Sequence, residues 1–325
     1  LPPCATMHHL SLPERSGGYN VSLPSQLYEQ AQLTTRYALK NSIDSNIRSL
    51  SLNSHQPYID SFVQSDQNKS TKSLKSNQLN VKQKLFSNLN DQNLIIENIR
   101  NELPKSEIET WCRLLPLLTP SIANFARKAS IRCLPTNSNL QKWGKSESDQ
   151  CPACKQKETD KHVLNNCSMA LHEGRYTWRH NAVLKEIVSM IEPRLPSSHK
   201  LYCDLDHYRN PCELFDSVRP DIAILTDKNC FVMELTCPHE LNMKQSHQYK
   251  ATKYKDITTT NNIKTQVFAC EISNLGFINR PELLKFLKAI NIQLELSCMR
   301  RLREMAIRCS YFIFYTSLGH RTVIY

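Results

Sequence analysis

The stretch RPDIAILTDKNCFVMELTCPHE, residues 219–240, has acidic residues near both ends of a strongly apolar segment that is interrupted by TDKN. If Asp227 and Lys228 are the central residues of a tight hairpin, the numbers of cross-strand partners add to 455. Asp221 and Glu234 satisfy this condition, so their Cβ atoms would lie about 4.5–5.5 Å apart on one face. A three-residue loop would shift the pairing by one residue. Two like charges that face each other repel, and a divalent cation bound between them makes the arrangement favourable. The spacing therefore predicts a Mg²⁺ site.

The segment HQYKATKYKDI, which follows the hairpin, carries Lys250, Lys253 and Tyr254 at spacings that place them on one face of a helix. A lysine beside the metal could orient the attacking hydroxide or stabilise the charge that develops on a phosphate. Together with Asp221 and Glu234, these three residues are the predicted catalytic set for phosphodiester hydrolysis. The alternative is that the lysines form a solvated helix face.

The segment CPACKQKETDKHVLNNC, residues 151–167, has the spacing C-x2-C-x7-H-x4-C. Cys151, Cys154, His162 and Cys167 would supply three thiolates and one imidazole, which fill the four positions of a structural zinc site. No position remains for a reactive water, so we expect this zinc to stabilise folding and to perform no chemistry. The alternative is that the four residues are unrelated, with Cys151 and Cys154 forming a redox pair.

The formal net charge of +11 makes nucleic acid the first partner to consider, although a basic protein without such a partner has the same charge. Candidate nucleic-acid-binding residues flank the cysteine cluster: Arg127, Lys128, Lys142, Arg175, Arg179 and His180. Nearby aromatic residues, Tyr176 and Trp178, could stack on bases or could form the apolar face of a helix.

The remaining cysteines favour an intracellular protein. The chain has thirteen cysteines, and most are scattered singly through apolar segments, which is typical of reduced core thiols. Examples are Cys112, Cys133, Cys230, Cys270 and Cys309. No run approaches the roughly 18 apolar residues that span a bilayer, and the N-terminus lacks the pattern of a signal peptide. We therefore expect no membrane association.

Hydrophobic periodicity predicts a mixed α+β fold, with a mostly helical N-terminal region, a small zinc knuckle and a final α/β domain. Strands are predicted near 220–226, 230–236 and 265–272, and helices near 176–191, 240–257, 281–290 and 292–308. The expected parts are a helical segment (1–63), a polar flexible loop (64–80), a helical linker region (81–150), the knuckle with a basic helix (151–195) and the α/β domain (200–325).

The residues RPD, twelve intervening residues, ELT and a following KATKY resemble the restriction-like endonuclease domain of site-specific non-LTR retrotransposons. That domain is part of the PD-(D/E)xK nuclease superfamily. Thr236 stands where the superfamily has its lysine, and the resemblance implies a lysine displaced to the next helix, either Lys250 or Lys253. The knuckle resembles the CCHC element that precedes this nuclease. IRCLPTNSNLQKWG is similar to the linker of the family, and LPERSGGYNVSLP to the stretch beyond its reverse transcriptase.

This resemblance implies a nuclear, Mg²⁺-dependent enzyme that nicks double-stranded target DNA, so that the new 3′-hydroxyl primes reverse transcription. It also implies that the Leu235 carbonyl assists metal binding and that element RNA is a second candidate ligand. The chain has no Tyr/Phe-x-Asp-Asp motif, so the polymerase site of the family is absent from it. Two alternatives are an inactive nucleic-acid-binding relic of such an element and a zinc-stabilised interaction module.

Overall fold

The computed structural model describes residues 10–13, 18–53, 57–64, 66–87, 95, 98–99, 101–215, 218–259 and 263–319. The chain divides into two compact units, Leu1–Asn93 and Leu94–Tyr325. The expected linker region, knuckle and α/β domain thus lie mostly within one unit.

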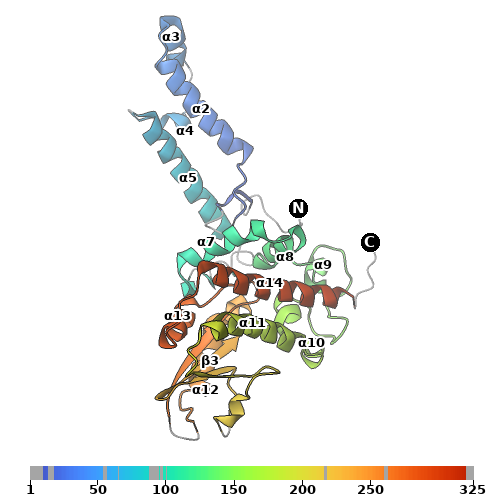
Figure 1. The fold of residues 1–325 in the computed structure, drawn as a ribbon. Helices are drawn as coiled ribbons and strands as arrows, with labels where there is room; N and C mark the ends of the chain where they lie inside the picture. The colour runs from blue at the N-terminus through green and yellow to red at the C-terminus, as the bar shows by residue number, and fades with distance from the viewer. Residues whose placement is uncertain are drawn as a thin grey trace. The chain divides into compact units, whose positions relative to one another are not determined.

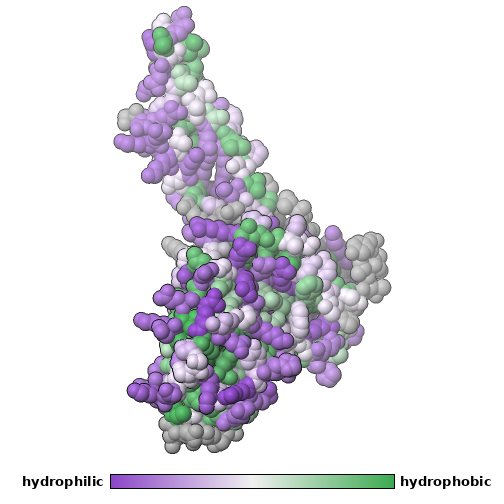
Figure 2. All heavy atoms as spheres, viewed as in Figure 1, coloured by the Kyte–Doolittle hydropathy of each residue, from purple (hydrophilic) through white to green (hydrophobic). Residues whose placement is uncertain are grey.

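The N-terminal unit is helical, with α2 (Pro24–Lys40), α3 (Ser45–Asn53), α4 (Pro57–Asp60) and α5 (Gln67–Ser87) (Figure 1). Helix α2 begins at a proline, whose missing N–H would have no partner in a first helical turn. A small core joins α2, α4 and α5 through Leu33, Tyr37, Ile59 and Leu74. Hydrophilic residues cover much of the surface of α2 and α5 on the face shown in Figure 2.

Helix α5 corrects the expectation of a flexible loop over 64–80. Its composition is polar, but Ser70, Leu74 and Gln78 recur every four residues and are buried. The Gln78 amide nitrogen donates to Glu29, and the Gln30 amide nitrogen donates to Gln78 at 2.9 Å. These residues form a narrow, partly polar contact surface along α5. Their contacts stabilise a helix that composition alone does not indicate.

The C-terminal unit is built on a four-stranded mixed sheet with strand order β1-β2-β3-β4. The first two pairs of neighbours are antiparallel, and β3 and β4 are parallel. Three strands lie where the sequence predicts them: β2 (Ile222–Leu225), β3 (Asn229–Thr236) and β4 (Lys264–Glu271). The edge strand β1 (Lys200–Cys203) was not predicted.

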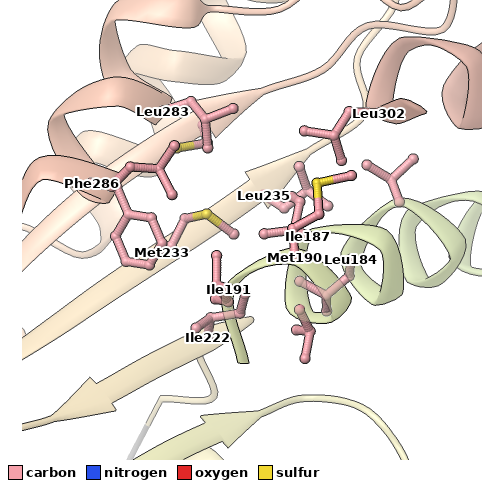
Figure 3. Packing of buried hydrophobic residues seen from close by; sticks show 14 of the residues in the cluster. Leu184, Ile187, Met190, Ile191, Ile222, Met233, Leu235, Leu283, Phe286 and Leu302 are labelled. Atoms are coloured by element: carbon pink, nitrogen blue, oxygen red, sulfur yellow. The ribbon is translucent and has the colours of Figure 1, made fainter. Parts of the chain in front are cut away.

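One face of the sheet packs against α11 (Arg175–Ile191), α13 (Arg280–Ala289) and α14 (Leu296–Leu318). Figure 3 shows Ile187 of α11, Met233 and Leu235 of β3, Phe286 of α13 and Leu302 of α14 within this core. Helix α12 (Met243–Lys253) contacts β3 and β4 from the side on which Glu234 lies. The sheet therefore presents Glu234 to α12 and Met233 to the main core.

A second core joins α7 (Lys105–Leu114) and α8 (Pro120–Ser130) to α14 and to the loop after β4. Prolines separate these two helices, because Pro116 follows α7 in a short 3-10 helix and Pro120 begins α8. Trp111 stacks on Phe277 with ring centroids 5.2 Å apart, and its indole nitrogen donates to the Leu275 carbonyl at 2.7 Å. These contacts fix the helical linker region to the α/β part.

A buried ion pair also links α7 to α14. Arg303 contacts both carboxylate oxygens of Glu107, with Nη2 2.8 Å from Oε2, and the two residues are 2% and 3% exposed. The guanidinium also donates to the Gly276 carbonyl at 2.9 Å. Gly276 has φ of +77°, and a Cβ there would approach the Arg303 carbonyl oxygen to 2.7 Å, so the position requires glycine.

These elements confirm the predicted mixed α+β fold class. Cys112, Cys230, Cys270 and Cys309 are buried free thiols as expected, and Cys133 is buried as well. Among the helices of the described residues, none combines the length and the apolar character that crossing a membrane requires.

Candidate functional site

The β2–β3 hairpin has the register that the sequence predicts. Ile222 pairs with Met233 and Leu225 with Cys230, so the numbers of each pair add to 455. Thr226 donates its backbone N–H to the Asn229 carbonyl at 2.9 Å, which leaves Asp227 and Lys228 as the two central turn residues. Asp221 and Glu234 follow the same pairing immediately beyond the strand pair, and the Asp221 N–H donates to Glu234 Oε1 at 3.2 Å.

Both carboxylates of this acidic site are buried: Asp221 is 8% exposed and Glu234 is 1% exposed. Asp221 Oδ2 accepts a hydrogen bond from the Leu235 N–H at 2.7 Å. Asp221 Oδ1 lies 3.3 Å from His180 Nε2, which reaches it from α11. The two carboxyl groups are thus held by the backbone of the hairpin and by a helix from the other side of the sheet.

Lys250 is the lysine that α12 brings to this site. Its Nζ lies 2.7 Å from Glu234 Oε2 and 5.5 Å from the Tyr254 ring centroid. Tyr254 is buried beside Glu234, and burial together with the charge of that carboxylate raises the pKa of the tyrosine. Lys253 lies over the Tyr254 ring, with its Nζ 4.9 Å from the ring centroid. The geometry therefore favours Lys250 for contact with the acidic pair, and places Lys253 next to the tyrosine.

The electrostatics of the site follow from its burial. Burial, with the nearby negative charge of Asp221, raises the pKa of Glu234 to about 7, although Lys250 and Tyr254 act in the opposite direction. A cation bound between the carboxylates would favour their charged forms. Carboxylate oxygens are the ligands that Mg²⁺ prefers, so Asp221 and Glu234 are the residues that could hold such an ion.

This pKa predicts how stability depends on pH. Because the folded-state pKa of Glu234 lies above its unfolded value near 4.5, the folded state loses stability as pH rises from about 4.5 through 7. Without added Mg²⁺, we expect a loss on the order of 2 kcal/mol in the free energy of unfolding between pH 5 and pH 8. Urea unfolding of zinc-loaded protein measures this, and Glu234→Gln should remove most of the difference.

Added Mg²⁺ should raise the melting temperature at pH 8 in the wild type and not in Asp221→Asn. An equal rise in both proteins would contradict a cation site between the carboxylates.

Two residues that the sequence assigned to nucleic-acid binding have other partners. Arg179 is 1% exposed and donates to the carbonyls of Leu164 and Cys237 at 3.0 and 3.2 Å, so its assignment to nucleic-acid contact is wrong. Burial lowers the pKa of His180, but its contacts with Asp221 and Asn181 outweigh this and raise it overall. His180 therefore belongs to the acidic site, a contact that nothing in the sequence indicates.

The other basic candidates lie on separate elements. Arg127 and Lys128 are half-buried in the last turn of α8, and Lys142 is exposed on α9 (Asn137–Lys142). Arg175 begins α11 and forms an ion pair with Glu173. Trp178 is 49% exposed, whereas Tyr176 points inward. Nucleic-acid contact by these residues stays a prediction.

The four predicted zinc ligands come together. Ligand atoms of Cys151, Cys154, His162 and Cys167 all lie within 4.8 Å of one another. Cys154 Sγ is 3.3 Å from His162 Nε2 and 3.9 Å from Cys167 Sγ. A tetrahedral zinc with Zn–S bonds of about 2.3 Å separates two sulfurs by about 3.8 Å, so the cluster has the size of a zinc site. Burial lowers the pKa of His162, which favours the neutral imidazole that binds metal.

Local structure explains how the cluster forms. Cys151 and Cys154 lie in a turn in which Lys155 donates its N–H to the Cys151 carbonyl at 2.8 Å. His162 begins a π-helix (His162–Asn166), and Cys167 precedes α10 (Ser168–His172). The Tyr176 hydroxyl accepts from the Cys167 N–H at 2.9 Å and donates to the Val163 carbonyl at 3.0 Å. Helix α11 therefore supports the ligands from outside the cluster.

Comparison with known families agrees with this geometry. Residues 97–173 match the family model described as zinc-binding in reverse transcriptase, and the matched range includes all four cluster residues. The chain thus contains a zinc-binding domain of the type associated with reverse transcriptases. A comparison with curated proteins found no match.

Proposed function

We propose that this chain is the Mg²⁺-dependent DNA-nicking part of a non-LTR retrotransposon protein. The observation that carries the proposal is the arrangement of Asp221, Glu234 and Lys250, in which the backbone N–H of one buried acidic residue donates to the carboxylate of the other and a lysine contacts that second carboxylate. A fragment of this kind would act in the nucleus on double-stranded DNA and would support target-primed reverse transcription. The match to a zinc-binding domain of reverse transcriptase supports the same element class.

Each residue of the acidic site has a role in this proposal. Asp221 and Glu234 would hold the cation, which when bound activates water and offsets charge on the phosphate. His180 and the Leu235 N–H orient Asp221, so its carboxylate has a fixed position before substrate binds. Lys250 supplies positive charge beside Glu234, where it can stabilise the negative charge that develops on the scissile phosphate. Tyr254 limits the movement of Lys250 through contact with its ring.

The zinc cluster has a structural role in this proposal. All four positions around the ion would be filled by protein ligands, which leaves none for substrate or water. The net charge of +11 supports binding of a polyanion, with double-stranded DNA as the substrate and element RNA as a second ligand.

Nicking of supercoiled plasmid tests the proposal. In Mg²⁺ the wild type should convert supercoiled to open-circular DNA, and Asp221→Asn, Glu234→Gln and Lys250→Met should each lower the rate by about 10²–10⁴-fold. Asp227→Asn is the matched control, because this acidic residue is exposed in the hairpin turn and should leave the rate unchanged. Folded variants that nick as fast as the wild type would contradict the proposal. DNA binding without nicking by the wild type would instead favour the inactive relic.

A further inference from the structure

A second carboxylate pairs with a histidine at the end of β4. Glu271 is 1% exposed, and its Oε1 lies 3.1 Å from His247 Nδ1 on α12. Asn279 donates its side-chain amide to Glu271 Oε2 at 2.7 Å and its backbone N–H to the Glu271 carbonyl at 2.9 Å. Glu271 is therefore held by partners on both of its carboxylate oxygens, and His247 has a fixed orientation.

This pair lies next to the acidic site. His247 and Lys250 are three residues apart on α12, so their side chains share one helix face, and Tyr254 follows four residues later at the C-terminal cap of the helix. On the sheet, Glu234 of β3 pairs with Ala269 of β4 in a parallel register, and Glu271 lies two residues after Ala269 on β4. Residues two apart on a strand point to the same face, so Glu271 and Glu234 both face α12. Neighbouring side chains three residues apart on a helix have Cβ atoms about 5–6 Å apart, which places His247 one turn from Lys250.

The hydrogen bond to Glu271 determines which imidazole nitrogen is available. Nδ1 faces Glu271, with its two oxygens at 3.1 and 3.3 Å. Nε2 is the opposite ring nitrogen and is directed away from the carboxylate. The His247 side chain is 33% exposed, so the ring can exchange a proton with solvent. A carboxylate that orients an imidazole in this way is a common arrangement for acid–base catalysis.

We propose that His247, oriented by Glu271, donates the proton that the leaving 3′-oxygen requires when the phosphodiester is hydrolysed. This inference rests on the proposed nuclease function, in which the nick must end in a 3′-hydroxyl. A bond forms between the water oxygen and phosphorus, and the bond between phosphorus and the 3′-oxygen breaks. The bonding electron pair leaves with the 3′-oxygen, which takes the proton from His247 Nε2. The proton of the attacking water passes to solvent, and the exposed ring is reprotonated from solvent.

The charged groups around the imidazole are consistent with a proton donor. Glu271 faces it from β4, and Glu282 of α13 adds negative charge near Glu271. Lys244 and Lys250 lie three residues to either side on the helix of His247 itself. Glu271 is the charged group in direct contact with the ring.

The test uses His247→Gln, whose amide can still donate to Glu271 and hold α12 in place. The full chain, zinc-loaded and in Mg²⁺, is given two DNA duplexes that differ at the nicked bond. One has the normal 3′-oxygen, and the other has a bridging 3′-sulfur, which leaves without a proton. We expect His247→Gln to slow cleavage of the oxygen substrate by about 10²–10⁴-fold and to leave cleavage of the sulfur substrate nearly unchanged.

Controls separate this role from a structural one. His172→Gln changes an exposed histidine of α10 in the same way and should not alter either rate. His247→Asn is the second variant if the glutamine variant does not fold, and Glu271→Gln should act in the same direction with a smaller loss. An equal loss on both substrates would mean that His247 only positions α12, and no loss on either would also overturn the inference. Failure of the nuclease function itself is recognised separately, because wild type and Asp221→Asn would then give the same background.

Discussion

Zinc removal by a strong chelator is expected to unfold the segment from Cys151 to Cys167 and to lower the melting temperature of the C-terminal unit. Bonds from the zinc ion to Cys151, Cys154, His162 and Cys167 would link the turn at Cys151 to the π-helix at His162, and chelation removes these bonds. Apparent binding free energies of structural zinc are about 10–16 kcal/mol, so this is the largest effect expected for the chain. A colorimetric zinc assay should find one ion released per chain, and circular dichroism should show the loss of helix.

Variants of the ligands should have the same effect as chelation. Cys154→Ser should lower zinc content and melting temperature, whereas Cys212→Ser, at an exposed free cysteine, should change neither. A chain that purifies without zinc and melts cooperatively at an unchanged temperature after chelation would contradict the structural role of the cluster.

The buried pair of Glu107 and Arg303 gives the second large effect. Glu107→Ala should destabilise the C-terminal unit by about 3–5 kcal/mol, because it leaves the Arg303 guanidinium buried without its counter-charge. The Ile278 N–H, which donates to Glu107 at 2.7 Å, also loses its acceptor. Urea unfolding at saturating zinc measures the change in the free energy of unfolding.

An exposed ion pair on the same helix provides the control. Arg308 and Glu304 are 2.7 Å apart in an i, i+4 pair on α14, with Arg308 47% exposed. Arg308→Ala should therefore cost no more than about 0.5 kcal/mol. If both variants lose the same small amount, the buried pair does not stabilise the connection between α7 and α14.

Local patterns allowed much of the fold to be predicted. The hairpin is an example, because a two-residue turn sets its register and both strands lie close together in the sequence. Strand β1 has only four residues, KLYC, and its partner β2 begins only at Ile222, so no short-range periodicity marks it. Helix α5 was missed because tertiary contacts at Leu74 and Gln78 stabilise it despite its polar composition.

Some residues of the candidate site could also be predicted from the sequence, and others could not. Asp221 and Glu234 could be paired from the sequence because one hairpin carries both, and the cysteine cluster because its ligands lie within seventeen residues. To choose between Lys250 and Lys253 one must know how α12 is oriented about its own axis. The structure shows this orientation through the contacts of the two lysines. His180 and the pair of His247 and Glu271 depend on packing between distant segments, although the spacing of His247 and Lys250 on one helix face could have been noticed.

The buried side chain of Arg179 connects two sites that are separate in the sequence. Its guanidinium donates both to the Leu164 carbonyl, within the π-helix of the cysteine cluster, and to the Cys237 carbonyl, three residues after Glu234. Hydrogen bonds from Arg179 therefore connect the knuckle to the segment that follows β3. A chimera that exchanges the knuckle between related chains should retain its fold only when the exchanged segment includes α11 together with residues 151–167.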